Sequence, residues 1–185
     1  MDVLEVRFQH EVLRIEPWGS DSVRVRSAQG SLPSSDVGAL TDPPPCGPVE
    51  VSEGKLVNGE LTVLVSLPED DGFPFPVVRF LRTSTGEELL AEEREHFWWP
   101  GARVFYGNRS GAGEVHQQFK AYPGERFYGM GQRTHGRLDH KGLALDLVQR
   151  NAEVSIPFVL TSRGYGFLWN NPAIGKVTFG KNGTE

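Results

Sequence analysis

Three acidic residues, Asp139, Asp146 and Glu153, lie within one short stretch of the sequence. Two carboxyl groups held about 5 to 10 Å apart can hydrolyse a glycosidic bond, because one serves as acid or base while the other acts as nucleophile or activates water. The spacing of these three residues places no two of them face to face. Since most acidic side chains are solvated, we expect surface residues here rather than a catalytic pair.

Histidines offer the next candidates, because His135 and His140 flank Asp139. Two histidines five residues apart share neither one face of a strand nor the i, i+4 spacing of helical zinc sites, so we predict no metal site. The segment Gly129–Gly131 holds half of a dinucleotide fingerprint without the third glycine, and we interpret it as a turn at a strand end. A Gly-x-Ser-x-Gly nucleophile motif is absent from the sequence. The residues therefore predict no cofactor.

Aromatic residues are more suggestive than the acids. Residues 97–100 read FWWP, and further aromatic residues accompany amide and guanidinium side chains downstream. Sugar rings pack against aromatic planes and hydrogen-bond to such polar groups, so the mixture suits carbohydrate, although a sandwich core with polar edges has the same composition. The downstream residues are Tyr122, Phe127, Tyr128, Trp169, Gln132, Arg133, Arg150 and Asn151.

The elements that must position these side chains are strands. In residues 4–8, 13–16 and 23–26 every second residue is apolar, which is the period of a strand with one wet face. Asn58-Gly59 is typical of a tight hairpin turn between 49–57 and 60–65. Further strands are predicted at 77–81, 156–160 and 165–169, and one begins at Val177. We predict an all-β fold, an antiparallel β-sandwich.

Two segments depart from this alternation. Residues 31–48 are rich in Ser, Pro, Asp and Gly and predict a surface loop, whereas 87–95 favour helix by propensity and leave helix and strand equally open. A length of 185 residues suits one all-β domain, so we predict a single domain over 1–185. The strand from Val177 has no visible closing partner, so we expect the sandwich to lack its last strands.

Amino-acid composition limits the kinds of binding partner and the cellular compartment that we expect. The formal charge of −5 comes with scattered Lys and Arg residues, so we expect no nucleic-acid partner. Cys46 is the single cysteine, which excludes an intramolecular disulfide and is typical of a reducing compartment. The charged N-terminal residues differ from a signal peptide, and no apolar run approaches the roughly 18 residues of a membrane span. We therefore expect a cytoplasmic protein without a membrane partner.

Several ordered motifs resemble glycoside hydrolase family 31, the α-glucosidase and α-xylosidase group. Residues 124–132, GERFYGMGQ, look like the family's "G-E-x-F-Y-G-x-G" motif. Residues 156–158, IPF, and 162–172, SRGYGFLWNNP, are similar to its "I-P-F … S-R-G-Y-G-x-L-x-N-x-P" run. The resemblance is strong from about Val115 onward and, with the opening strands, covers most of the chain. It implies the N-terminal domain, a galactose-mutarotase-like β-sandwich (supersandwich).

The resemblance also implies where function lies. Family members are retaining enzymes whose two catalytic aspartates are on a (β/α)₈ barrel that follows this domain, and neither aspartate motif is present, so no catalytic residue is assigned. The N-terminal domain of the family extends a loop to the mouth of the active site, where it shapes the leaving-group subsite. By motif position that loop contains Gln149, Arg150 and Asn151, which we predict to bind carbohydrate substrate. Many members have Asp where this chain has Asn151.

Two other hypotheses remain open at this point. The chain could be a free-standing carbohydrate-binding or interaction sandwich, or an aldose epimerase that uses His135 or His140, although the second idea follows from fold analogy alone. We also expect an uncovered sheet edge or apolar face that favours self-association into a homo-oligomer.

Overall fold

Fifteen β-strands make up the regular structure of the described residues, which contain no helix. The computed structural model describes residues 2–34, 38–40, 42–67, 75–93, 101–107 and 113–180. All strand pairs within the sheets are antiparallel, so the all-β antiparallel prediction is confirmed. The chain divides into two compact units, unit 1 (Met1–Ser35 and Asp42–Lys120) and unit 2 (Asp36–Thr41 and Ala121–Glu185). One domain over 1–185 stays a prediction.

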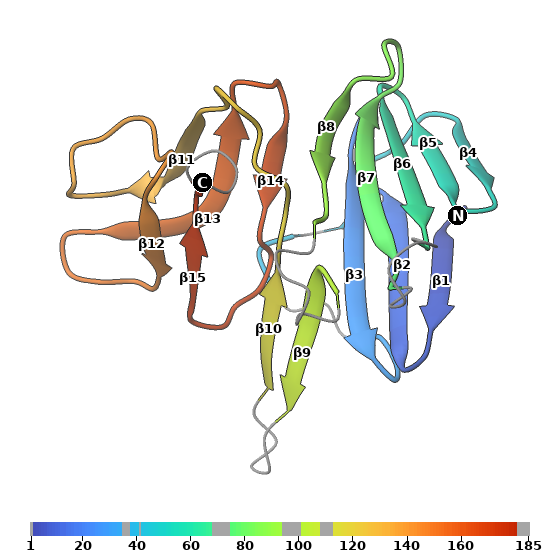
Figure 1. The fold of residues 1–185 in the computed structure, drawn as a ribbon, viewed down its shortest axis with the longest axis horizontal. Helices are drawn as coiled ribbons and strands as arrows, with labels where there is room; N and C mark the ends of the chain where they lie inside the picture. Colours follow the sequence, from blue (N-terminus) through green and yellow to red (C-terminus); the bar gives the residue numbers. More distant parts are fainter. Residues whose placement is uncertain are drawn as a thin grey trace. The chain divides into compact units, whose positions relative to one another are not determined.

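Unit 1 contains two sheets and a hairpin (Figure 1). The three-stranded sheet has the order β1-β2-β3, and the five-stranded sheet has the order β4-β5-β6-β7-β8. The hairpin pairs β9 with β10. The strands are β1 (Leu4–Phe8), β2 (Glu11–Pro17), β3 (Val23–Gln29), β4 (Val49–Ser52), β5 (Lys55–Asn58), β6 (Leu61–Ser66), β7 (Val77–Arg82), β8 (Glu88–Ala91), β9 (Arg103–Gly107) and β10 (Gly113–Gln117).

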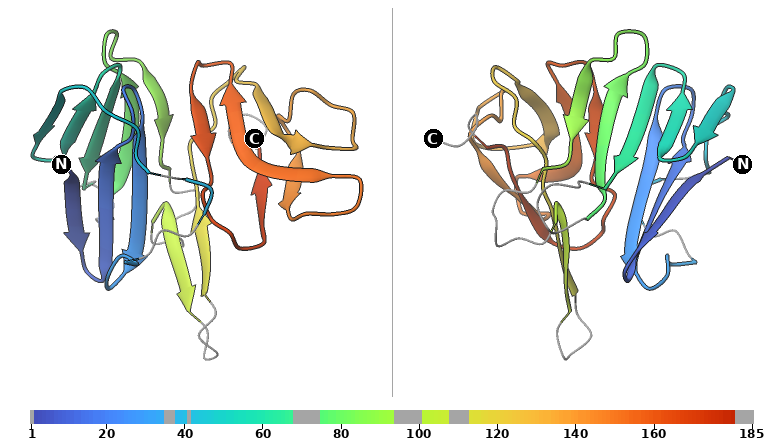
Figure 2. Two further views of the ribbon diagram at one scale, coloured as in Figure 1. Left: turned by 180° about the vertical axis from the view of Figure 1, so that it is seen from behind. Right: turned by 45° about the vertical axis from the view of Figure 1, so that its right-hand side comes forward.

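The core of unit 1 lies between its two sheets. Leu13 and Ile15 of β2 face Leu56 of β5, Val63 of β6 and Val78 of β7 in one buried cluster. Figure 2 shows the two sheets as separate layers, β1–β3 in blue and β4–β8 in teal and green. The alternation in the opening strands thus places the apolar residues between the layers, as a sandwich requires.

Two local predictions in unit 1 concern a turn and a strand. The predicted tight turn between β5 and β6 is present, but its two residues are Gly59 and Glu60, because Asn58 still pairs with Leu61 at the end of β5. Gly59 has φ 56°, a conformation in which glycine has little steric cost. In the ambiguous segment 87–95, residues Glu88–Ala91 form strand β8, which pairs with β7. Pairing with a neighbouring strand and burial of Leu89 and Leu90 outweigh the local helix propensity.

A buried ion-pair network connects the elements of unit 1. The Arg103 guanidinium donates hydrogen bonds to Glu92, to Glu11 at 2.7 Å and to the Pro76 carbonyl at 3.0 Å. Glu92 also accepts a 2.8 Å bond from the backbone N–H of Val78. Because Glu11 starts β2 while Val78 is in β7, the network links both layers of the sandwich.

Unit 2 contains two smaller sheets. One has the order β11-β13-β14, and the other pairs β12 with β15. The strand predicted from Val177 is confirmed as part of β15, and it does have a partner, β12, which the sequence pattern did not reveal. The strands are β11 (Phe127–Gln132), β12 (Ala144–Leu147), β13 (Val154–Thr161), β14 (Gly166–Leu168) and β15 (Gly175–Thr178). Met130, Leu145, Val159 and Phe179 form the buried cluster of this unit.

Gly129–Gly131 is a β-bulge inside β11, which corrects the prediction of a turn at a strand end. The register with β13 shifts between Gly129 and Gly131, and all three residues have positive φ, 110°, 62° and 82°. A Cβ on Gly131 would lie 2.0 Å from the Val154 carbonyl oxygen, so only glycine fits. The Met130 side chain is buried, so the bulge keeps the strand against the core while it redirects the next residues of the chain.

Candidate functional site

The predicted carbohydrate-binding residues lie on the loop 148–153 that joins β12 to β13 (Figure 1). A bridge pairs Arg150 with Glu153 and closes the loop around a two-residue tip of Asn151 and Ala152. Ala152 has φ 66°, a left-handed conformation that costs a non-glycine residue about 1 kcal/mol. A strained tip of this kind persists only where the surrounding structure holds it.

Gln149 forms part of the structure of this loop. Its Nε2 donates to the Ser155 carbonyl at 2.8 Å, and its Oε1 accepts from the Ser155 backbone N–H at 3.0 Å. The side-chain amide therefore makes the two hydrogen bonds to the Ser155 backbone that a neighbouring strand would otherwise make. Substrate binding by Gln149 stays a prediction, and its amide is already engaged on both sides.

Arg150 and Asn151 present their polar groups to solvent. One guanidinium nitrogen of Arg150 donates to Asp146 at 2.6 Å, and the Arg150 side chain remains 58% exposed. The Asn151 side chain is exposed and makes no hydrogen bond with any residue that the structure describes. Asn can donate and accept, and Arg keeps further N–H donors in a fixed fork. Both side chains can therefore bind the hydroxyl groups of a sugar. Asn151 is the best placed of the three predicted residues, because its amide is not engaged by any residue that the structure describes.

Beneath the tip lies Arg133, a residue that the sequence indicated only as part of a polar and aromatic group. Its side chain is 5% exposed and donates to Met130 O, Asp146 O and Ser155 Oγ at 3.0, 3.0 and 2.9 Å. Its Nη1 also lies 3.7 Å from Glu153. The position of Arg133 directly after a glycine-rich strand was the only sequence signal for its role. Its hydrogen-bond acceptors could not be identified without knowing how the strands pair.

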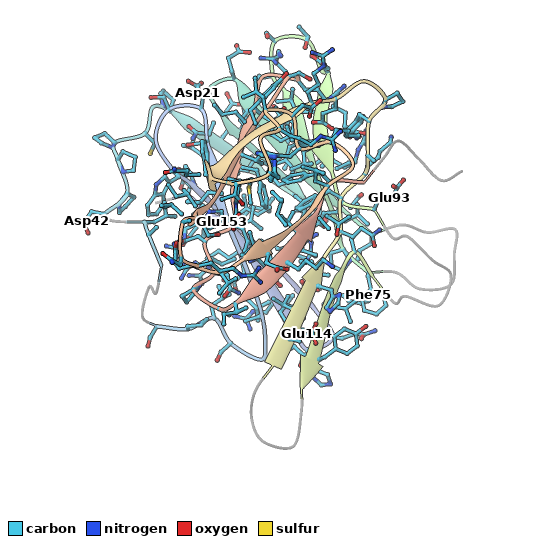
Figure 3. The ribbon with its side chains drawn as sticks, turned by 90° about the vertical axis from the view of Figure 1, so that its left-hand side faces the viewer. Asp21, Asp42, Phe75, Glu93, Glu114 and Glu153 are labelled. Atoms are coloured by element: carbon cyan, nitrogen blue, oxygen red, sulfur yellow. The ribbon has the colours of Figure 1, made fainter. Side chains whose placement is uncertain are left out.

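The three acids of the sequence analysis have structural partners. Glu153, which is labelled in Figure 3, accepts a 2.7 Å bond from the Thr134 hydroxyl and a 3.2 Å bond from the Thr134 backbone N–H. These two hydrogen bonds lower the pKa of Glu153. The backbone N–H groups of Lys141 and Phe127 likewise lower the pKa of Asp139. Asp146 binds Arg150. All three carboxylates thus have hydrogen-bond or ion-pair partners in the protein, and the expectation that they are not a catalytic pair stays a prediction.

The histidines lie together, although their spacing gave no reason to expect it. The rings of His135 and His140 meet edge to face with centroids 5.3 Å apart. His140 is buried rather than an ordinary loop residue, and its Nε2 lies 2.9 Å from the Gly129 carbonyl oxygen. Its Nδ1 is buried and has no hydrogen-bond partner among the residues that the structure describes. Among the residues that the structure describes, no three His, Cys, Asp or Glu side chains gather as a metal site would require.

Among the aromatic candidates that the structure describes, Tyr122 is buried and Phe127, Tyr128 and Trp169 are half-buried. Phe127 packs against Phe179 with centroids 4.7 Å apart, and Tyr122 is buried beneath the Arg163 guanidinium, which lies 4.1 Å from its ring centre. These rings are occupied by protein partners, as the sandwich-core interpretation expects. Residues 97–100 lie outside the described residues.

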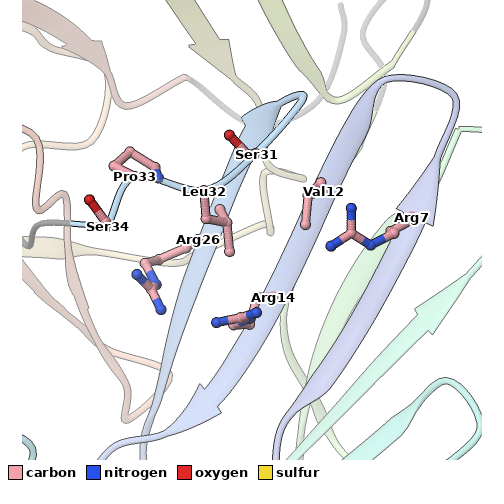
Figure 4. Close-up of a pocket in the computed structure, with 8 residues that line it drawn as sticks. All are labelled: Arg7, Val12, Arg14, Arg26, Ser31, Leu32, Pro33 and Ser34. Atoms are coloured by element: carbon pink, nitrogen blue, oxygen red, sulfur yellow. The ribbon is translucent and has the colours of Figure 1, made fainter.

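A separate hollow of about 370 Å³ lies on the outer face of β1–β3 in unit 1 (Figure 4). Arg7, Arg14 and Arg26 line it, together with residues 31–34. Arg7 and Arg14 both pair with Glu5, and Arg26 pairs with Glu16. Because these three guanidinium groups share the two carboxylates of Glu5 and Glu16, we interpret the hollow as a surface ion-pair network. Within the described ranges, no helix has the length and apolar character to cross a membrane.

Comparison with known proteins identifies the family. The family model "Glycosyl hydrolase 31 N-terminal galactose mutarotase-like domain" matches residues 12–177. An uncharacterised family 31 glucosidase from Pseudescherichia vulneris is 34% identical over the whole chain, and an alpha-xylosidase from Saccharolobus solfataricus is 40% identical over 55% of it. The chain covers 37% and 16% of these two relatives.

Solved structures agree with this family. The crystal structure of a family 31 α-xylosidase from a soil metagenome, in complex with xylose, superposes with a TM-score of 0.83 at 34% identity. That alignment covers 98% of this chain and 29% of the other. The chain thus spans well under half of the proteins that it resembles. It belongs to glycoside hydrolase family 31 and corresponds to the family's N-terminal galactose-mutarotase-like domain.

Proposed function

We propose that this chain is the non-catalytic N-terminal domain of a retaining α-glycosidase, an α-xylosidase or α-glucosidase, and that loop 148–153 forms part of the leaving-group sugar site. The observation that carries the proposal is the braced tip, where Asn151 is unpartnered among the described residues and Arg150 is exposed. The relatives support the substrate class, since two of those compared are named α-xylosidases. A loop donated by a neighbouring domain can complete a site at the loop-bearing face of a barrel.

The reaction would proceed by double displacement on a pair of carboxyl groups outside these 185 residues. One carboxylate attacks the anomeric carbon while an acid protonates the leaving oxygen, and water then hydrolyses the glycosyl ester. Asn151 and Arg150 would hold the departing sugar through its hydroxyl groups. They would contribute binding and orientation without forming a bond to substrate.

The first test uses the isolated chain. We expect no turnover of p-nitrophenyl α-glucoside or α-xyloside by the purified 185 residues, because Asp139, Asp146 and Glu153 are engaged in structural hydrogen bonds. Hydrolysis that copurifies with the chain at constant specific activity would overturn the assignment of catalysis to another domain.

The second test uses the full-length enzyme. Asn151→Ala and Arg150→Met should lower kcat/KM for isoprimeverose about tenfold each, the effect of losing one or two sugar hydrogen bonds. Both variants should leave kcat/KM for p-nitrophenyl α-xyloside within about twofold of wild type, because this leaving group has no sugar hydroxyl groups. Equal losses on both substrates would contradict a role in binding the leaving sugar.

A free-standing carbohydrate-binding domain is the competing proposal. The isolated chain would then bind a sugar by itself, whereas a tip that forms only one wall of a subsite should bind at best with millimolar Kd. Titration calorimetry with maltose and isoprimeverose distinguishes the two. An aldose epimerase has less support, because His140 is buried and its Nε2 lies against the Gly129 carbonyl. Rapid anomer exchange that is lost in His135→Ala or His140→Ala would revive it.

A cytoplasmic location and self-association complete the proposal. The single Cys46 suits a reducing compartment. One face of β13 presents a row of apolar side chains, Ile156, Phe158 and Leu160, that are 50%, 39% and 52% exposed. Light scattering should therefore show a mass that rises with concentration and falls in Leu160→Gln. A strictly monomeric wild-type chain would contradict this part.

A further inference from the structure

Arg133 binds three separate strands of unit 2 through a single guanidinium group. Its acceptors are the Met130 carbonyl in β11, the Asp146 carbonyl in β12 and the Ser155 hydroxyl in β13. The last two strands are the ones that loop 148–153 connects. Arg133 therefore fixes the two ends of that loop relative to each other, through bonds of 3.0 Å to β12 and 2.9 Å to β13.

The bulge in β11 explains how Arg133 reaches this position. The bulge directs the Met130 carbonyl toward Arg133 Nε and the Gly129 carbonyl toward His140 Nε2, at 3.0 and 2.9 Å. The Gly131 backbone passes so close to Val154 that a Cβ would clash. The glycine-rich motif thus brings the residue after β11 beneath the loop.

The brace continues from Arg133 toward the loop tip. Glu153 lies 3.7 Å from the guanidinium and also binds the Thr134 hydroxyl and backbone N–H. Glu153 is in turn the bridge partner of Arg150. A side chain that is 5% exposed and uses every edge of its fork is pre-organised, so it holds its partners with little freedom.

We propose that Arg133 is a positioning residue for recognition of the leaving sugar, which it serves by holding Arg150 and Asn151 of loop 148–153 in their binding geometry. The inference rests on the proposed function of loop 148–153 and adds the residue on which its geometry depends. Arg133 is buried beneath the tip and acts through the loop, without contact with substrate. A small displacement of binding groups can cost as much as their removal.

The test compares two substrates in the full-length enzyme. Arg133→Met should lower kcat/KM for isoprimeverose roughly tenfold while kcat/KM for p-nitrophenyl α-xyloside stays within about twofold. Arg133→Lys keeps the charge but lacks the fork, so it should resemble Arg133→Met. The matched control is Arg126→Met, because Arg126 is exposed just before β11 and its guanidinium has no hydrogen-bond partner in the described part of the chain. This control should match wild type on both substrates.

A milder variant keeps the test decisive if Arg133→Met does not fold. Ser155→Ala removes one acceptor of the guanidinium and retains the backbone bonds to Gln149, so it should lower the isoprimeverose to aryl xyloside ratio about threefold. Hydrogen exchange on the isolated chain should show faster exchange at 150–155 in Arg133→Met, with exchange in β5 to β7 unchanged.

The outcomes separate this inference from the proposed function. If Asn151→Ala lowers the substrate ratio while Arg133→Met and Ser155→Ala leave it at wild type, the brace is not what positions the tip and the inference falls alone. If Asn151→Ala and Arg150→Met also leave the ratio unchanged, the loop does not bind the leaving sugar and both fall. A wild-type substrate ratio in Arg133→Lys would show that a positive charge is enough to position the loop, and would contradict the role given to the guanidinium fork.

Discussion

Replacing Arg103 by methionine removes the cation from the buried network of unit 1 and keeps a side chain of similar length. The side chains of Arg103, Glu92 and Glu11 are 6%, 4% and 13% exposed. The variant leaves two carboxyl groups inside the sandwich without their shared guanidinium. Removing one partner of a buried ion pair costs about 3–5 kcal/mol, because the remaining charge is uncompensated.

The size of this loss depends on pH. For a protein of this length each kcal/mol shifts Tm by about 2–4 °C, so Arg103→Met should lower Tm by roughly 6–20 °C near pH 8. Burial raises the pKa of Glu92 above 4.5 even with Arg103 beside it, and removal of Arg103 raises that pKa further. A carboxyl with a raised folded-state pKa stabilises the fold most below its unfolded pKa and loses this contribution as pH rises. The deficit should therefore shrink at pH 5.

Thermal unfolding followed by circular dichroism at pH 5 and pH 8 measures this deficit. Arg79→Met is the matched control, since Arg79 is 45% exposed and pairs with Glu88 on the surface, where such a pair contributes less than about 1 kcal/mol. Adding Glu92→Gln to Arg103→Met should recover part of the lost stability at pH 8. Equal Tm values for the two arginine variants, or a deficit that is the same at both pH values, would refute the reasoning.

Two further predictions concern unit 2. Gly131→Ala should lower the free energy of unfolding, measured by urea denaturation, by about 3 kcal/mol or more, because its Cβ would overlap the Val154 carbonyl at φ 82°. The control Gly136→Ala, at φ 70° in open space, should lose only about 1 kcal/mol. Equal losses in the two variants would contradict the clash. Tyr165→Phe removes the 2.9 Å bond to buried Glu125 and should lose about 1–3 kcal/mol. Burial already raises the pKa of Glu125, so this loss should be larger at pH 8 than at pH 5, and a larger loss at pH 5 would refute the assignment.

Strand positions were accessible to sequence reasoning because burial of one sheet face has a period of two. The hairpin that joins β5 to β6, with its turn one residue later than predicted, and the strand from Val177 followed from local chemistry alone. Strand β8 did not, because its acidic, helix-favouring residues are held by pairing with β7. The bulge at Gly129–Gly131 was mistaken for a turn, since glycines with positive φ occur in both and only the register with β13 distinguishes them.

The candidate site was predictable in its position along the chain but not in its construction. Motif resemblance indicated Gln149, Arg150 and Asn151, and the structure places them on one short loop. Which of the three side chains is engaged by the protein and which is not depends on contacts with Ser155 and Asp146. Those contacts depend on how β12 and β13 are arranged. Arg133 was named only among polar neighbours, because its acceptors are mostly backbone carbonyls, and these carry no sequence pattern.

The central claim is that this chain shapes a reaction whose catalytic carboxyl groups lie outside it. The most direct measurement is covalent trapping of the full-length enzyme with a fluorinated α-xylosyl fluoride, followed by peptide mass spectrometry to locate the sugar ester. We predict one labelled carboxylate beyond residue 185 and none within residues 1–185. A sugar ester on Asp139, Asp146 or Glu153 would contradict the account.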